Sequence, residues 1–350
     1  MTSPQTWPDV LSALVDGEDL DSASTAWAMR EILDGNATPA QIAAFAVSLR
    51  SKGETVAELR GLADEMLAHA RLLDVQDRVV DIVGTGGDRA QTVNISSMSA
   101  VVVAGAGIGV VKHGNRAASS RSGSADVLEA LGIRLDVPAD RVLDVQREAG
   151  ITFCFAPVFH ASFRHTAVPR RELGIATPFN WLGPLTNPAR PGAMAVGCAN
   201  PHVAPIVAGV FASRGTDALV FRGEDGLDEV TVSTGTRFWT TRDGAVDESL
   251  VDPGELGFER SPREALRGGE AEHNAQVFRD VMDGATGPIR DAVLLNAATG
   301  IAAHGGESQA PLLQRLAHGV ERARESIDSG AAARVLAEWA RATQRWAPQD

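Results

Sequence analysis

A short apolar segment, 79–83, leads directly into the glycine-rich turn Gly84-Thr85-Gly86-Gly87-Asp88. Helical and extended patterns alternate from there onwards. Helices are expected at 95–104, 124–131 and 138–148, and strands at 108–111, 151–155, 193–198, 218–221 and 230–233. Such alternation is typical of a layered α/β fold with a mostly parallel sheet, whose ligands bind beyond the carboxyl ends of the strands.

The residues before this first strand predict a small bundle of amphipathic helices. One helix is expected over 22–33. Thr38 precedes Pro39 as an N-cap, and Thr55 forms a capping box with Glu58, each ahead of an apolar stripe. We therefore predict a small helical domain over 1–76, onto which the helical segment 164–186 packs back, and a large α/β domain over 77–163 and 187–350.

The chain has 350 residues and a formal net charge of −13. Nucleic acids and anionic membrane surfaces need clustered Lys and Arg, so this charge argues against both as main partners. No apolar stretch approaches the roughly 20 residues needed to span a bilayer, and no secretory signal is visible. Cys154 and Cys198 form no CxxC pair, so two reduced, buried thiols in a cytoplasmic protein are expected.

The glycine turn is suited to bind an anion. Glycines let backbone N–H groups approach a phosphate closely, and the following helix adds the positive end of its dipole. The turn is neither a Walker A sequence nor a GxGxxG motif, and a tight turn without a ligand is the alternative. The run Thr92-Val93-Asn94-Ile95-Ser96-Ser97 starts the next helix, where its oxygens either cap the helix or bind a diphosphate or a metal-bound water.

Local positive charge is concentrated in 112–124, which follows the strand expected at 108–111. Lys112, Arg116 and Arg121 alternate there with Gly and Ser, a pattern that favours phosphate recognition over solvated surface cations. The acidic run 223–229 follows another expected strand. Its carboxylates form either a solvated turn or, if they face the other loops, hard oxygen ligands for Mg²⁺, which binds through one or two protein carboxylates plus substrate phosphates.

Taken together, these segments resemble the anthranilate phosphoribosyltransferase family of tryptophan biosynthesis. The resemblance rests on Gly84-Thr85-Gly86-Gly87-Asp88, Asn94-Ile95-Ser96, Lys112-His113-Gly114-Asn115-Arg116 and Gly226-Leu227-Asp228-Glu229, and extends to 155–157, 170–174, 179–189, 274–275 and 291–297. It implies a fold similar to the pyrimidine nucleoside phosphorylases and a homodimer formed through the helical domain. It also implies transfer of a phosphoribosyl group from 5-phosphoribosyl-1-diphosphate (PRPP) to anthranilate.

The resemblance implies a set of site residues as well. PRPP would contact Gly84, Gly87, Asp88, Thr92, Asn94, Ile95, Ser96, Ser97, Lys112, Ser120 and Ser124. Magnesium would be held by Ser96, Asp228 and Glu229, and anthranilate would meet Gly84, Asn115 and Arg170, with the arginine suited to its carboxylate. Lys112, His113 and Asn115 are the predicted catalytic residues. Lys112 stabilises the departing diphosphate, while His113 and Asn115 orient the acceptor; a loop histidine bonded to backbone is the alternative for His113.

Two positions depart from the family's pattern. His160-Ala161-Ser162-Phe163 stands where His-Pro-Ala-Met is frequent, beside the path of the aromatic substrate, and Arg222 replaces a frequent His before the acidic run. Three other interpretations are a nucleoside phosphorylase of the same fold, a non-catalytic PRPP-binding regulator and a structural α/β protein with decorated loops. A phosphorylase has no diphosphate–magnesium leaving group to hold, so the Lys-His-Gly-Asn and Asp-Glu motifs weigh against it.

Overall fold

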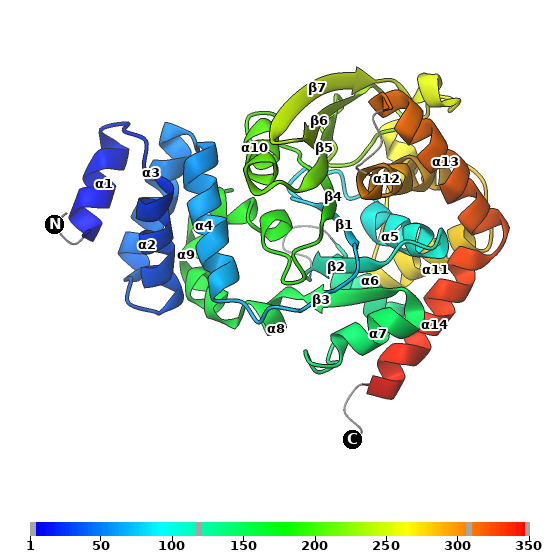
Figure 1. The fold of residues 1–350 in the computed structure, drawn as a ribbon, viewed down its shortest axis with the longest axis horizontal. Helices are drawn as coiled ribbons and strands as arrows, with labels where there is room; N and C mark the ends of the chain where they lie inside the picture. Colours follow the sequence, from blue (N-terminus) through cyan, green and yellow to red (C-terminus); the bar gives the residue numbers. More distant parts are fainter. Residues whose placement is uncertain (1–4, 117–120, 306–309, 347–350) are drawn as a thin grey trace.

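The computed structural model describes residues 5–116, 121–305 and 310–346, and it begins with four helices at one end of the molecule (Figure 1). They are α1 (Trp7–Val15), α2 (Ser22–Leu33), α3 (Pro39–Lys52) and α4 (Val56–Ala68). Thr6, Thr38 and Thr55 each close a capping box at the start of a helix, and each cap contributes about 1 kcal/mol. The helical bundle predicted from the sequence is confirmed.

A segment from the middle of the chain packs against this bundle. Helix α9 (Ala167–Leu173) contacts α3, and the 3₁₀ helix η1 (Ala161–Thr166) contacts α2. The prediction of a continuous helix across 164–186 is wrong, because Gly174 ends α9 in the left-handed conformation with a φ of 61°. Two short 3₁₀ helices follow, η2 (Pro178–Asn180) and η3 (Gly183–Leu185). The proposed domain boundaries stay a prediction.

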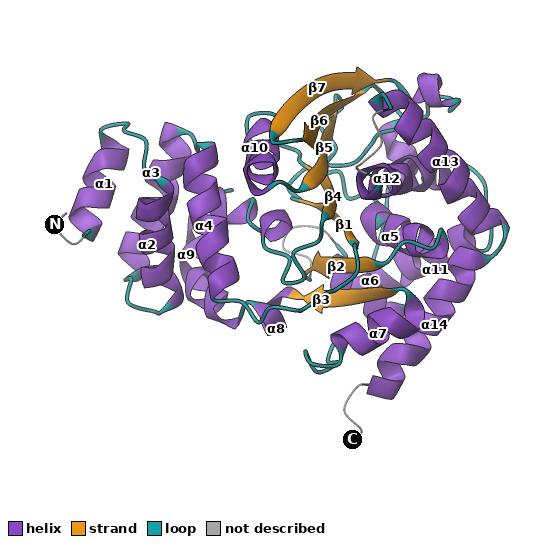
Figure 2. Cartoon of the chain, in the orientation of Figure 1, coloured by secondary structure: helices purple, strands orange, loops and turns teal. Residues whose placement is uncertain are grey.

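The rest of the chain surrounds a seven-stranded sheet with the strand order β3-β2-β1-β4-β5-β6-β7 (Figure 2). The strands are β1 (Val80–Gly84), β2 (Val110–Gly114), β3 (Ile151–Phe155), β4 (Ala193–Gly197), β5 (Asp217–Gly223), β6 (Thr236–Arg242) and β7 (Ala245–Val251). The first five in this order are parallel, and β6 and β7 continue the sheet antiparallel. The mostly parallel α/β sheet is thus confirmed.

Helices cover both faces of the sheet, as a parallel sheet requires. Alternate residues of β4 show the division: Ala195 packs in the cluster with α5 (Ile95–Gly105) and α12 (Pro288–His304), whereas Met194 and Val196 pack with α10 (Ala204–Arg214) and the bundle. The remaining helices are α6 (Ser124–Ala130), α7 (Val142–Ala149), α8 (Ala156–Phe159), α11 (Ala271–Met282), α13 (Leu312–Asp328) and α14 (Ala331–Trp346), with 3₁₀ helices η4 (Pro253–Leu256) and η5 (Arg263–Leu266).

Three sequence predictions of secondary structure are corrected. The segment 230–233 is no strand; it turns through Thr231 and Ser233, whose hydroxyls bind the Asp225 carboxylate. The sheet continues instead through β6 and β7, which the sequence analysis missed. Strand β2 lies later than the expected 108–111, and α7 begins at Val142, after the expected start at 138.

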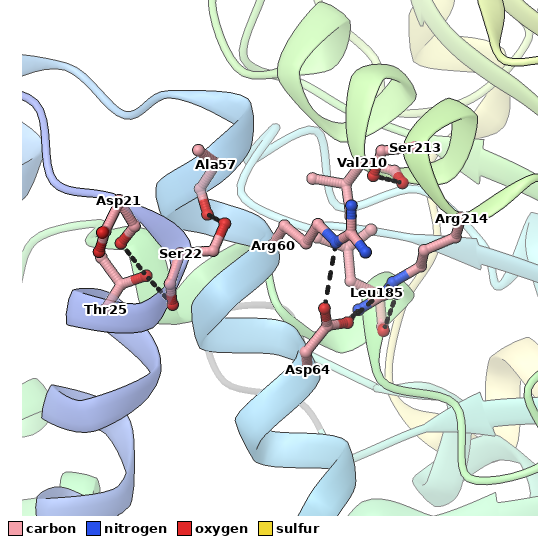
Figure 3. A network of polar contacts seen from close by, with 10 residues as sticks. All are labelled: Asp21, Ser22, Thr25, Ala57, Arg60, Asp64, Leu185, Val210, Ser213 and Arg214. Atoms are coloured by element: carbon pink, nitrogen blue, oxygen red, sulfur yellow. Dashed lines mark hydrogen bonds and ion pairs between the residues drawn. The ribbon is translucent and has the colours of Figure 1, made fainter.

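The bundle is joined to the α/β part by an ionic contact between α4 and α10 (Figure 3). Arg214 donates to Asp64 at 2.6 Å and to the carbonyl oxygen of Leu185 at 2.8 Å, while Arg60 approaches the same carboxylate at 3.2 Å. Beside it lies a cavity of about 620 Å³ lined by α4, α10 and residues that precede β4 and β5. This cavity therefore lies toward the amino ends of these strands.

Candidate active site

The site is built where β1 and β4 end side by side. Gly84 and Gly197 are register partners at these ends, and the Asp228 segment lies directly over both. A Cβ on Gly84 would come within 2.3 Å of Asp228 Oδ2, and one on Gly197 within 1.6 Å of the Asp228 carbonyl oxygen. The Gly86 N–H donates to Asp228 Oδ2 at 2.7 Å. The glycines thus let an acidic segment contact the strand ends and the glycine turn together.

Three carboxyl groups meet at this point. Burial and the neighbouring charge of Asp88 raise the pKa of Asp228 to about 7. Burial and then Asp228 raise the pKa of Glu229 well above its usual range, opposed by Lys112 and by a hydrogen bond from the Ser96 backbone N–H. Burial and the neighbouring carboxylates thus disfavour the charged forms of Asp228 and Glu229. Within the described residues, however, no three His, Cys, Asp or Glu side chains are arranged as a metal site.

The first turn of α5 contributes polar groups next to these carboxyls. Asn94 does not cap α5; its amide donates to the Ser122 carbonyl oxygen at 3.2 Å, and its Oδ1 accepts from Asn274 Nδ2 at 2.9 Å. The Ser97 hydroxyl is buried without a partner among the described residues. Thr92 pairs with Arg267 in an isolated bridge, and Ile95 is buried. Ser96 is half-buried, between Lys112 and Glu229.

Lys112 and His113 lie inside β2, so their placement in a flexible loop is corrected. The Lys112 side chain is 1% exposed. Its Nζ donates to the Ile82 carbonyl oxygen and approaches Ser96 Oγ at 3.4 Å. Burial lowers the pKa of Lys112, while the charges of Asp81 and Glu229 oppose this. Lys112 is therefore a buried cation placed beside the acidic cluster, at the end of the sheet.

His113 forms a buried pair with His160, with ring centroids 5.2 Å apart. His113 Nδ1 lies 3.0 Å from the Gly183 carbonyl oxygen, and His160 Nε2 lies 2.8 Å from that of Thr186. Each of these nitrogens must carry its proton to face a carbonyl. The other nitrogens, His113 Nε2 and His160 Nδ1, are buried acceptors without a partner among the described residues. Burial lowers the pKa of His113 to about 3 and that of His160 to about 4.

We predict from this histidine pair that the free energy of unfolding depends on pH. Because the pKa of His160 is about 4 in the fold and 6.5 as its ordinary value, the unfolded chain binds the extra proton first, and stability is lost as pH falls below 6.5. Lowering the pH from 7 to 5 should cost the wild type about 2 kcal/mol more than His160→Gln. Buried carboxyls with raised pKa values change the free energy of unfolding in the opposite direction, and they do so in both proteins. The difference between the two proteins therefore reports on His160. Urea unfolding at both pH values measures it, and equal losses would contradict it.

The loop after β2 is only partly described. Ser120 lies outside the described residues. Asn115 is exposed and its Oδ1 accepts from the Arg116 N–H at 2.8 Å. Arg116 pairs with Asp126 and Glu129, which neutralise its charge, so it does not add to the positive charge as the sequence pattern suggested. Ser124 is half-buried and begins α6.

Arg170 lies on α9, and its guanidinium stacks 5.4 Å from the Phe163 ring centroid. Burial lowers the pKa of Arg170, and no carboxylate among the described residues pairs with it. An arginine placed like this has its charge available for an anionic ligand. Arg222, in contrast, donates to the Ala199 carbonyl oxygen at 2.8 Å.

The structure therefore brings Gly84, Asp88, Ser96, Lys112, Asp228 and Glu229 together, and their roles stay predictions. Gly87 is exposed with a φ of 92° in the same turn. Sequence reasoning gave no role to Asp81, Gly197, His160 or Asn274. Gly197 could have been found from the sequence, because it ends an apolar strand as Gly84 does. Asn274 could not, because it lies at the start of a helix that is distant in sequence.

Two family models match the chain. A glycosyl transferase family helical bundle domain matches residues 8–70, and a glycosyl transferase family a/b domain matches residues 76–333. Together with the buried lysine and carboxylates at the strand ends, they define a glycosyl transferase with a helical and an α/β part.

Relatives with known names show which kind of glycosyl transferase this chain resembles. The chain is 61% identical over 340 residues to an anthranilate phosphoribosyltransferase of a Nocardioides species, covering 97% of this chain and 99% of that one. The same enzyme of Thermobifida fusca is 54% identical over 99% of both chains. The crystal structure of anthranilate phosphoribosyltransferase from Thermus thermophilus matches with a TM-score of 0.89 at 40% identity, over 96% of this chain and 99% of that one.

A structure of the Saccharomyces cerevisiae enzyme in complex with PRPP and Mg matches with a TM-score of 0.87 at 27% identity, over 97% of this chain and 98% of that one. The chain therefore belongs to the anthranilate phosphoribosyltransferase family.

Proposed function

We infer that this chain transfers the phosphoribosyl group of PRPP to anthranilate, giving N-(5-phosphoribosyl)anthranilate and diphosphate in tryptophan biosynthesis. Its near full-length identity to enzymes named for this reaction supports the reaction class. The observation that carries the inference in the structure is the placement of a buried lysine and three carboxyls at adjoining strand ends. Membership of this family sets aside the phosphorylase and the structural-protein alternatives.

Magnesium is the cation that this site would use. Burial, and then the neighbouring carboxylates, disfavour the charged forms of Asp228 and Glu229 and so raise their pKa values. A bound divalent cation would favour these charged forms. Asp228, Glu229 and Ser96 are the proposed ligands. The yeast structure that matches this chain is one with PRPP and Mg. When bound, the ion neutralises charge on the leaving diphosphate.

The donor would lie along the glycine turn and the start of α5. Its proposed contacts, carried from the sequence analysis, are Gly84, Gly87, Asp88, Thr92, Asn94, Ile95, Ser96, Ser97, Lys112, Ser120 and Ser124. Exposed backbone N–H groups of the turn and the amino end of α5 favour an anion there. Ile95 has a buried apolar side chain, so only its backbone groups are suited to this contact.

Departure of diphosphate leaves positive charge on the ribose, so catalysis is mainly electrostatic and positional. The ammonium of Lys112 stabilises the departing diphosphate. The amine of anthranilate has a free lone pair at neutral pH and forms a bond to the anomeric carbon as the C–O bond to diphosphate breaks. The nitrogen is then positively charged and acidic, so its proton passes to water or to the diphosphate without a strong base. His113 and Asn115 would orient the amine: His113 keeps a buried acceptor nitrogen free at its Nε2, to which an amine N–H can donate.

The first test is the fluorescence of anthranilate on mixing the protein with PRPP, with and without Mg²⁺. Magnesium-dependent loss of fluorescence, absent without PRPP, supports reaction class, donor and acceptor together. Thermal stabilisation by PRPP and Mg²⁺ without fluorescence loss would point to another acceptor. The absence of both responses would overturn the proposed function.

We expect Arg170→Ala to raise the KM for anthranilate about tenfold or more, with a much smaller effect on the KM for PRPP, because a desolvated arginine pairs strongly with a carboxylate. Steady-state kinetics with each substrate varied in turn measure this. Arg171→Ala is the matched control, since Arg171 is its exposed neighbour on α9. Equal effects of Arg170→Ala on both KM values would argue against a carboxylate contact.

A homodimer formed through the helical part is proposed on the exposure of apolar side chains there. Val15, Val168 and Ile175 are 74%, 42% and 56% exposed on or beside α1 and α9. Light scattering would test the dimer, and a monomeric mass would contradict it. No helix of the described residues is long and apolar enough to cross a membrane. A cytoplasmic location stays a prediction.

A further inference from the structure

The parallel sheet opens between β1 and β2, next to the site. Strand β1 pairs with β4 at five successive positions, and β2 pairs with β3 at five, from Val110 to Gly114. Between β1 and β2, all of whose residues are described, the paired register consists of Val80 with Val110 alone. The ladder thus stops after its first rung, although β1 and β2 are neighbours in the strand order of the sheet.

The backbone groups of the missing rung are bound by side chains. In the parallel register set by Val80 and Val110, the next rung would join the Ile82 N–H to the Val111 carbonyl and the His113 N–H to the Ile82 carbonyl. Instead, Asn187 Nδ2 donates to the Val111 carbonyl oxygen at 2.8 Å, and the His113 N–H donates to Asp81 Oδ1 at 3.2 Å. The Ile82 carbonyl accepts from Lys112 Nζ, and the Ile82 N–H lies close enough to the Asp81 carboxylate to oppose the rise in its pKa that burial causes.

Asp81 and Asn187 form one unit across this opening. Asn187 Nδ2 also donates to Asp81 Oδ2 at 2.8 Å, and Asn187 Oδ1 accepts from the Ala189 N–H at 2.9 Å. Asp81 is 0% and Asn187 is 3% exposed. Every hydrogen of the Asn187 amide is therefore used, as buried polar groups require. Two side chains replace the backbone pairing that would otherwise close the sheet.

The opening provides the position that Lys112 occupies. In a closed ladder the Ile82 carbonyl would accept from the His113 N–H, and the Lys112 ammonium would have to share that acceptor. The Asp81 carboxylate adds a negative charge beside the buried ammonium, which offsets part of the cost of burying it. Lys112 Nζ is thereby held toward Ser96, on the side of the acidic cluster.

We propose that Asp81 and Asn187 are positioning residues for the transfer: by holding β1 and β2 open, they fix the Lys112 ammonium where it meets the diphosphate of PRPP. The inference rests on the proposed function for the identity of that ligand. Asp81 has no proposed contact with the substrate. Any effect of Asp81 on PRPP binding must therefore act through Lys112.

A double-mutant cycle tests this dependence. PRPP with Mg²⁺ is titrated calorimetrically into the wild type, Asp81→Asn, Lys112→Met and the double variant. Asp81→Asn keeps the size of the side chain but removes its charge. It also places a second amide opposite the Asn187 amide. We expect it to weaken PRPP binding about tenfold in the wild-type background and less than about twofold in the Lys112→Met background. Equal weakening in both, or none in a folded Asp81→Asn protein, overturns the proposal.

Two controls separate positioning from loss of stability. Leu219→Ala creates a cavity in β5, where Leu219 is 1% exposed; it should lower the melting temperature without changing PRPP affinity. Where Asp81→Asn does not fold, Asn187→Ala replaces it in the same cycle with the same expected sign.

A crystal structure of Asp81→Asn gives a readout that does not depend on the substrate. Displacement of Lys112 Nζ from the Ile82 carbonyl supports the proposal, and an unmoved Lys112 overturns it. If the wild type itself does not bind PRPP, the proposed function fails, and this structure still decides whether Asp81 positions Lys112.

Discussion

Replacing Asp228 and Glu229 together by alanine is expected to lower magnesium-dependent turnover at least about a thousandfold, the equivalent of several kcal/mol of transition-state stabilisation. The fold should be retained. Asp228 loses its hydrogen bond from the Gly86 N–H. The substitution also removes the buried carboxyl of Asp228 and the half-buried carboxyl of Glu229, whose charged forms are disfavoured by desolvation and by neighbouring carboxylates. These effects oppose one another, so the melting temperature should change little.

Anthranilate fluorescence at saturating PRPP, titrated with Mg²⁺, measures the turnover of this double variant, and calorimetry measures its melting. Glu224→Ala is the matched control, because Glu224 is an exposed carboxylate of the same acidic run that pairs with Arg237. The control should keep its activity within about twofold. Near-normal activity of the double variant would remove the metal assignment.

Local sequence signals predicted the elements that are set by neighbouring residues. The N-cap at Thr38 and the capping box at Thr55 marked the starts of α3 and α4, because a cap and the groups it binds lie within one turn. The apolar run before Gly84 gave β1 in the same way. The glycine turn, the start of α5 and the acidic run were each expected at the sheet edge, and the structure brings Gly84, Ser96 and Asp228 together there.

Features that depend on distant partners were not visible in the sequence. Lys112 looks like a loop cation, because its burial in β2 is possible only where Asp81 and the Ile82 carbonyl face it. Strand β7 has mostly exposed residues and pairs only with β6, so it carries no buried apolar run to reveal it. The opening between β1 and β2 depends on Asn187, which is 106 residues from Asp81.

We expect Gly197→Ala to disturb the contact between the Asp228 segment and the strand ends more than a methyl group added at any other glycine of the site. Its Cβ would lie 1.6 Å from the Asp228 carbonyl oxygen and 2.5 Å from the carbonyl carbon, and these are backbone atoms that no rotamer change can move away. The Asp228 segment must shift off the ends of β1 and β4. Such overpacking typically costs about 1–3 kcal/mol of stability.

The loss of activity from Gly197→Ala should be the larger effect. A shift of about 1 Å at a positioned group is enough to lower turnover about a hundredfold, and here the displaced segment carries Asp228 and Glu229, two of the three proposed metal ligands. Gly305→Ala is the matched control, since no atom of the described residues would lie closer than 3.7 Å to its Cβ. Comparing the two variants by melting temperature and by the Mg²⁺ dependence of turnover separates the causes. If Gly197→Ala lost stability but kept the wild-type Mg²⁺ dependence, the contact between Gly197 and the Asp228 segment would serve packing alone, and the metal site would have to lie elsewhere.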